Sequence, residues 1–358
     1  MIVTDKYLST TPVMETILIS LRENLIETII MDDVVPNPLD LGIHKGVSLY
    51  QKNKCDLIIA VGGGSSIDST KGIGAIITNG GKIQDLVELG SINKPLPPFI
   101  AVPTTAGTGS EATVDAVISD SETHEKLILS SIHLLPTISI LDPTLTISLP
   151  RNQTAFTGID ALSHAIEAYT ARTSTPFSEA MGCYAIGLVG KYLQRAYQNG
   201  TDIEARGGML LASHMGGIAI SNDDKGCILG SIHTMGEVLA KSCDLSHGAA
   251  MAIFLPYIME QNLKATTDKY AHVAYLLGVN VVGLTKEEAA RNGIEHIKEM
   301  ERKCKIPPLS SYEVDPGDFD ELSEICKQNI FDPINPEKID AATYKMLYLK
   351  AYDNYYDI

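Results

Sequence analysis

The chain has 358 residues, of which 44% are hydrophobic and 20% are charged, and its formal net charge at pH 7 is −16. This length fits two domains of ordinary size, and so acidic a surface repels phosphate backbones, which argues against nucleic acid as a partner. The chain has no run of 18 or more apolar residues and no N-terminal signal pattern, so neither a membrane span nor secretion is expected. The six cysteines form no Cys-x-x-Cys pair and are expected to be reduced thiols of a cytoplasmic protein.

The first 150 residues alternate between short apolar runs and helical patterns. Continuous β-branched runs are typical of strands that are buried on both faces of a parallel sheet. We expect such strands at residues 27–31, 56–61, 99–102 and 138–141, and helices at residues 11–24 and 66–78. The alternation predicts a doubly wound, Rossmann-like α/β domain over residues 1–150.

From about residue 151 onward, long helical patterns dominate and strand candidates are few. The helices are expected at residues 151–170, 178–198, 203–221, 226–242, 250–262 and 286–304. The pattern therefore predicts an all-helical second domain over residues 151–358.

The strand at residues 56–61 continues directly into Gly62-Gly-Gly-Ser-Ser-Ile-Asp68, and a helix follows. Glycines allow the backbone to approach a phosphate closely, and the N-terminus of the helix directs N–H groups toward it. The alternative is a tight strand-to-helix turn with a capping serine.

A second loop, Val102-Pro-Thr-Thr-Ala-Gly-Thr-Gly-Ser-Glu-Ala-Thr113, contains a formal Gly-x-Gly-x-x-Ala sequence. We do not interpret it as a dinucleotide fingerprint, which belongs to the first strand-to-helix turn. The fingerprint is followed, at the end of the next strand, by an acidic residue that binds the ribose. Asp120 is near enough along the chain to be that residue, but no clean strand is expected before it. Thr104 and Thr105 are instead expected to offer hydroxyl and N–H groups to a nucleotide at the carboxyl edge of the sheet.

The sequence GIDALSHAIEAYT places Asp160 and His164 four residues apart, on one face of a helix. His233 lies on a later predicted helix, and His247 is expected on the loop or turn after that helix. One carboxylate and three neutral imidazoles suit a divalent transition metal such as Fe²⁺ or Zn²⁺. The alternative is a hydrogen-bonded pair on a helix surface, together with two satisfied core histidines.

Ordered motifs along nearly the whole chain resemble those of the iron-containing alcohol dehydrogenase family. They include ThrAspLys at 4–6, ProAsnPro at 36–38, AVGGGSSID at 60–68, PTTAGTGSEAT at 103–113, Lys126, LeuAspPro at 141–143, GIDALSHAIEAYT at 158–170, His233 and LSHG at 245–248. The resemblance implies a dinucleotide-binding α/β domain, an all-helical metal-binding domain, and an active site in the cleft between them.

The resemblance also assigns candidate site residues. It implies metal ligation by Asp160, His164, His233 and His247. For the cofactor it implies pyrophosphate binding by Gly63, Gly64 and Ser65, nucleotide contacts from Thr104, Thr105 and Lys126, a place near the adenosine for Asn37, and ribose hydrogen bonds to Asp5. A carboxylate at the ribose repels a 2′-phosphate, which favours NAD over NADP. The alternative for Asp5 is an Asx turn at the end of a strand.

The implied reaction is hydride transfer between a small alcohol or diol and nicotinamide, with the metal as Lewis acid on the substrate oxygen. Fe²⁺ is the expected metal, with Zn²⁺ as the alternative. Relatives often carry a histidine at the position of Glu237. A carboxylate there would relay protons, contact a polar substrate or approach the metal, or else pair with Lys241.

We expect a homodimer or a higher homo-oligomer. Family members usually carry a longer segment before ThrAspLys, and this segment often helps to form the dimer. Three other functions remain alternatives: a zinc-type glycerol or polyol dehydrogenase, a dehydroquinate-synthase-like lyase, and a binding scaffold that has lost catalysis.

Overall fold

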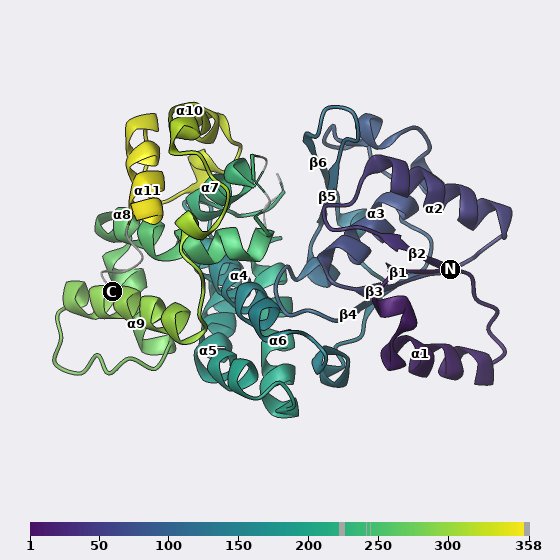
Figure 1. Cartoon of the computed structure of the whole chain (residues 1–358), viewed down its shortest axis with the longest axis horizontal. Helices are drawn as coiled ribbons and strands as arrows, with labels where there is room; N and C mark the ends of the chain where they lie inside the picture. The colour runs from purple at the N-terminus through teal and green to yellow at the C-terminus, as the bar shows by residue number, and fades with distance from the viewer. Residues whose placement is uncertain (222–225, 241, 244, 354–358) are drawn as a thin grey trace. The chain divides into compact units, whose positions relative to one another are not determined.

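The computed structural model describes residues 1–221, 226–240, 242–243 and 245–353. The chain forms two compact units, whose elements are labelled in Figure 1. Unit 1 contains Met1–Thr105, Gly109–Thr146, Gly226 and Cys227. Unit 2 contains Ala106–Thr108 and the other described residues from Ile147 onward. Each unit has its own hydrophobic core.

Unit 1 is built on a five-stranded, all-parallel sheet in the order β2-β1-β3-β4-β7. Every residue of the central β3 is buried, as expected for a strand that is covered on both faces. The strands are β1 (Ile2–Asp5), β2 (Ile30–Val34), β3 (Ile58–Gly62), β4 (Phe99–Pro103) and β7 (Ile138–Ser139). Since Gly62 pairs with Pro103, the loops after β3 and β4 start from the same edge of the sheet.

Helices cover both faces of this sheet, which confirms the predicted α/β fold (Figure 1). On one face, α1 (Pro12–Glu23) packs Met14 against a cluster that includes Ile59. On the opposite face, α2 (Asp40–Lys52) and α3 (Gly64–Asn79) bring Ile43 and Ile73 into a cluster with Val3. Consecutive strand residues point to opposite faces, so the sheet supplies both clusters.

The structure of unit 1 differs from expectation in three places. The strand expected at residues 27–31 is β2, three residues later, and the sequence analysis did not predict α2. A separate antiparallel hairpin, β5 (Asp115–Ser119) with β6 (Lys126–Ser130), was also not predicted. The expectation that no strand precedes Asp120 is therefore wrong. The Asp120 carboxylate accepts hydrogen bonds from the backbone N–H groups of Glu122 and Thr123 and so shapes the turn between the two strands.

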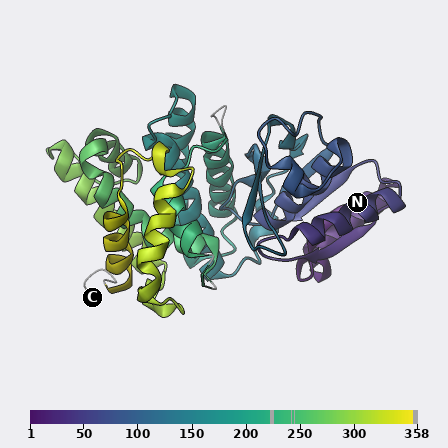
Figure 2. The same ribbon diagram turned by 90° about the horizontal axis from the view of Figure 1, so that it is seen from above.

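The described residues of unit 2 contain helices and no strand, as predicted (Figure 2). Three features differ from expectation. The helix expected at residues 226–242 is the shorter α7, α8 continues past residue 262 across a kink at Thr266, and α10 and α11 were not predicted. The helices are α4 (Arg151–Thr170), α5 (Pro176–Gln198), α6 (Ile203–Ile220), α7 (Ser231–Leu239), α8 (His247–Leu276), α9 (Lys286–Lys303), α10 (Phe319–Gln328) and α11 (Ala341–Asp353).

Helix α4 is the centre of unit 2, and every residue from Gly158 to Thr170 is buried. Two neighbouring helices approach it at backbone contact. A Cβ added at Gly182 on α5 would lie 2.8 Å from the Ala165 carbonyl oxygen, and one at Gly248 on α8 would lie 2.8 Å from the Phe156 carbonyl oxygen. Only glycine permits these approaches, and the second brings the first turn of α8 against α4.

Two sequence-based expectations concern the chain as a whole. Among the described residues, no helix combines the length and the apolar character that a membrane crossing requires. None of the six cysteines, all of which the structure describes, forms a disulfide; Cys304 and Cys326 are buried and the other four are partly buried.

Candidate metal centre and cofactor-binding residues

Four side chains from three helices of unit 2 converge on one point. Asp160 and His164 come from α4, His233 from α7 and His247 from α8. One ligand atom from each lies within 4.8 Å of all the others. Asp160 Oδ1 lies 3.9 Å from Nε2 of His164, 3.9 Å from Nε2 of His233 and 3.5 Å from Nε2 of His247. Tetrahedral ligands at metal-bonding distance are separated by about 3.4 Å, so this spacing is close to a coordination shell.

Burial and hydrogen bonding show that the cluster fits a cation. The side chains of Asp160, His164 and His233 are at most 5% exposed, whereas that of His247 is 38% exposed. Asp160 Oδ1 and His233 Nε2 are buried atoms without a hydrogen-bond partner among the described residues. A buried polar atom without a partner is costly, and a divalent ion would satisfy both atoms at once.

Burial also shifts the pKa values of three of these groups. Burial, reinforced by the charges of Glu167 and Glu237, raises the pKa of Asp160 to about 8. Burial lowers the pKa of His233 to about 3, and burial together with the neighbouring imidazoles lowers the pKa of His164 well below its usual value. The protein environment therefore favours neutral imidazoles, which is the form that binds metals.

The structure excludes one alternative for these residues and corrects one expectation. Asp160 and His164 are not a pair on a helix surface, because both lie in the buried stretch of α4. His247 does not lie on a loop or turn but is the first residue of α8, which places its imidazole at the N-terminus of a long helix.

Sequence reasoning did not identify Glu167, which lies against this cluster. Its Oε2 is 2.5 Å from Nδ1 of His233, and its Oε1 accepts a hydrogen bond of 2.8 Å from the Ile232 N–H. The signal was present, because Glu167 follows Asp160 by seven residues and His164 by three, which places all three on one helical face. Burial raises the pKa of Glu167 to about 8.

Glu237 lies on α7, one turn after His233, and is partly buried. Its charge raises the pKa of Asp160, so the carboxylate acts on the same cluster. Lys241, its alternative partner, lies outside the described residues.

The glycine-rich loop of unit 1 forms a narrow turn between β3 and α3. Gly62 has φ 152°, in the region that favours glycine, and Gly63 is the N-cap of α3. A Cβ on Gly63 would lie 3.1 Å from the Thr105 hydroxyl oxygen, and the Thr104 N–H donates to the Gly62 carbonyl at 3.0 Å. The structure thus brings Gly63, Gly64, Ser65, Thr104 and Thr105 together at the carboxyl edge of the sheet, beside the N-terminus of a helix.

The structure also brings two other candidate cofactor residues together. The Lys126 ammonium donates to Asn37 Oδ1 at 2.9 Å and to the Ser119 hydroxyl at 3.0 Å. Asp5 ends β1, and its Oδ1 accepts a hydrogen bond of 2.9 Å from the Leu8 N–H. Asp5 thus holds a local turn at the end of its strand, although this hydrogen bond reaches three residues along the chain and not the two of an Asx turn.

The sequence matches two family descriptions in order along the chain. "Iron-containing alcohol dehydrogenase" matches residues 1–143, and "Fe-containing alcohol dehydrogenase family, C-terminal" matches residues 154–352.

Individual relatives agree with this match. The NAD-dependent methanol dehydrogenase of Bacillus methanolicus is 38% identical over 93% of this chain and 86% of its own length. The 1,3-propanediol dehydrogenase of Klebsiella pneumoniae is 37% identical over 93% of this chain and 85% of its own length. The solved alcohol dehydrogenase of Oenococcus oeni superimposes with a TM-score of 0.94 at 36% identity, covering 98% of this chain and 91% of that chain. This chain belongs to the iron-containing alcohol dehydrogenase family, whose members are NAD-linked oxidoreductases.

Proposed function

We propose that this protein is a metal-dependent alcohol dehydrogenase that uses NAD(H) to interconvert a small alcohol or diol with its aldehyde. The observation that carries the proposal is the cluster of Asp160, His164, His233 and His247, with its unpartnered buried oxygen and nitrogen. Fe²⁺ is the proposed metal and Zn²⁺ the alternative, since three imidazoles and one carboxylate suit both ions. Relatives named for methanol and 1,3-propanediol support a small substrate.

A divalent metal in this cluster supplies Lewis-acid polarisation of a substrate oxygen, and NAD supplies the hydride acceptor. The chain's own contribution is three imidazoles and one carboxylate positioned by three helices. His247 is the most exposed of the four, so substrate would approach from its side. We assign Glu237 a second role, proton relay or contact with a hydroxylated substrate, because its charge already acts on Asp160.

For the cofactor, we propose that Gly63, Gly64 and Ser65 hold the pyrophosphate. Backbone N–H groups at the start of α3 and the positive end of its dipole favour a phosphate there. Thr104 and Thr105 would contact the nucleotide from the adjacent loop, and the hydrogen-bonded pair of Asn37 and Lys126 would lie near the adenosine.

The discriminating experiment measures metal content and turnover in protein purified without air. We expect about one Fe or Zn per chain and oxidation of NADH with small aldehydes. Bound metal with turnover only on glycerol-like ketones would favour the polyol alternative. Absence of both metal and turnover, even after addition of Fe²⁺ or Zn²⁺, would support a scaffold that has lost catalysis. Size-exclusion chromatography of the same sample tests the proposed homo-oligomer.

The role of Asp5 in cofactor selection can be separated from its role in the turn. Asp5→Asn keeps an oxygen for the Leu8 N–H but removes the charge, whereas Asp5→Gly removes both. If the carboxylate repels a 2′-phosphate, both variants should raise the NADP-to-NAD ratio of kcat/KM, by about tenfold if the repulsion contributes about 1.4 kcal/mol. Unchanged ratios in both variants, with lower stability only in Asp5→Gly, would leave Asp5 with the turn alone.

A further inference from the structure

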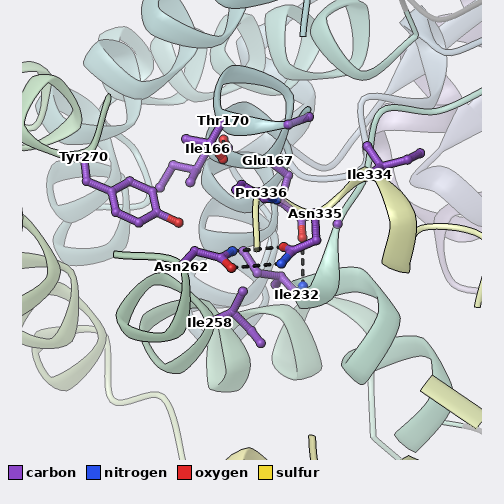
Figure 3. A pocket seen from close by; sticks show the side chains of 12 residues that line it. Ile166, Glu167, Thr170, Ile232, Ile258, Asn262, Tyr270, Ile334, Asn335 and Pro336 are labelled. Carbon is purple, nitrogen blue, oxygen red and sulfur yellow. Dashed lines mark hydrogen bonds between the residues drawn. The ribbon is translucent and has the colours of Figure 1, made fainter. Parts of the chain in front are cut away.

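The buried carboxyl group of Glu167, on α4, contacts both the first turn of α7 and the imidazole ring of His233 on α7. Glu167 on α4 is 5% exposed. Its Oε1 accepts the Ile232 N–H at 2.8 Å (Figure 3). Its Oε2 lies 2.5 Å from His233 Nδ1. Each carboxylate oxygen thus has a different partner on α7.

The contact with Nδ1 determines which nitrogen of His233 is available to a metal. Nδ1 lies 2.5 Å from Glu167 Oε2 and is therefore engaged with that carboxyl group. Nε2 is left as the ring nitrogen that faces the cluster: it is buried, has no hydrogen-bond partner among the described residues and lies 3.9 Å from Asp160 Oδ1. Hydrogen bonds of this kind fix the tautomer and the ring orientation of metal-binding histidines.

The contact with Ile232 fixes the helix that carries the ring. The N-cap residue of α7, Gly230, has no side chain to satisfy the first N–H groups of the helix. Two distant side chains do so instead: Glu167 at Ile232 and Asn335 Oδ1 at Ser231, the second at 3.3 Å. A Cβ on Gly230 would lie 3.1 Å from Glu167 Oε1 and 3.2 Å from Asn335 Oδ1, so glycine leaves room for both.

We propose that Glu167 is the positioning residue of the metal centre, which holds α7 to α4 and directs His233 Nε2 at the ion. The inference rests on the proposed metal-dependent function. It differs from a simple capping role, which would need only Oε1.

The test compares Glu167→Gln with Tyr344→Phe. The glutamine retains an oxygen that can accept the Ile232 N–H, but its NH₂ group cannot accept a proton from His233. Tyr344 serves as the matched control. It is fully buried, and its hydroxyl contacts Ser231 Oγ at 2.9 Å at the same end of α7, without touching the four clustered side chains.

We expect Glu167→Gln to weaken Zn²⁺ or Co²⁺ binding by about 10–100-fold in chelator competition and to shift the visible absorption of the Co²⁺ form. Tyr344→Phe should lower stability but leave both the affinity and the spectrum at wild-type values. Wild-type affinity and spectrum in Glu167→Gln would overturn the inference, as would an equal loss of affinity in both variants.

A measurement on the wild-type protein tests the inference even if Glu167→Gln does not fold. In the Zn²⁺-loaded wild type, nitrogen NMR of labelled histidine should show His233 protonated at Nδ1. Protonation at Nε2 would overturn the inference. If the wild type binds no divalent metal at all, the proposed function fails as well, whereas metal binding unaffected by Glu167→Gln contradicts only the positioning role.

Discussion

Replacing His247 with alanine is expected to lower metal affinity and NAD-linked alcohol oxidation by at least about 100-fold, the upper range for losing a residue that only supports a ligand. The change removes one of the four proposed metal ligands from the cluster. It should leave the fold intact, because the His247 side chain is 38% exposed and lies at the first residue of α8. The other three members of the cluster are buried, so replacing any of them would also change the packing of the helices.

The matched control is His272→Ala, a histidine in the last turns of the same helix. His272 Nδ1 lies 3.0 Å from the Tyr169 hydroxyl and takes no part in the cluster. Metal content by mass spectrometry, kcat/KM and thermal unfolding should be measured on both proteins. Full activity in a metal-free His247→Ala protein would refute the metal mechanism.

The second large effect is expected on stability, from Lys71→Met in α3. Lys71 is fully buried, and its ammonium donates to the Thr113 carbonyl at 2.7 Å, the Thr113 hydroxyl at 2.9 Å and the Asp115 carbonyl at 2.6 Å. Burial lowers the pKa of Lys71, while the nearby carboxylates of Asp68 and Asp115 oppose that shift. Methionine fills similar space but leaves these acceptors and acids without a cation, which should cost about 3–5 kcal/mol.

Lys45→Met on the neighbouring helix α2 provides the comparison. Lys45 pairs with Asp33 at the surface and is 67% exposed, so its removal should leave the free energy of unfolding close to the wild-type value. Urea unfolding gives the free energies, and hydrogen exchange in α3 and β5 identifies the unit that loosens. Equal stability of the two variants would show that the buried ammonium contributes nothing net.

The sequence predicts features that repeat locally, and it misses those that depend on distant partners. Alternating apolar runs predict the parallel sheet, and α4 has the bounds predicted from its helical pattern. The pattern at Ile43, Val47 and Tyr50 of α2 has helical spacing and could have been recognised. By contrast, nothing near Lys71 indicates that its acceptors lie more than 40 residues away.

The candidate site shows the same division. Spacing pairs Asp160 with His164 on one helical face, and their donor types make His233 and His247 candidate partners. Spacing cannot show that the four side chains meet, because three separate helices must pack first. The extent of α8 was not predicted. The predicted helix already spans Pro256 and ends at residue 262, whereas the helix observed continues to Leu276 across a kink at Thr266, whose backbone is not helical.

The residues of the two units alternate along the chain, and this affects how the protein can be divided into fragments. The segment Ala106–Thr108 belongs to unit 2, where Ala106 joins the helical core and Gly107 packs against Thr157. Cys227, far along the chain, belongs to unit 1 and contacts the Asp115 carboxylate. A fragment cut near residue 150 would therefore lack Cys227 and expose Ala106, so truncation is a poor route to a cofactor-binding fragment. The units are interleaved in sequence, and point substitutions within the intact chain are the sounder way to assign their separate tasks.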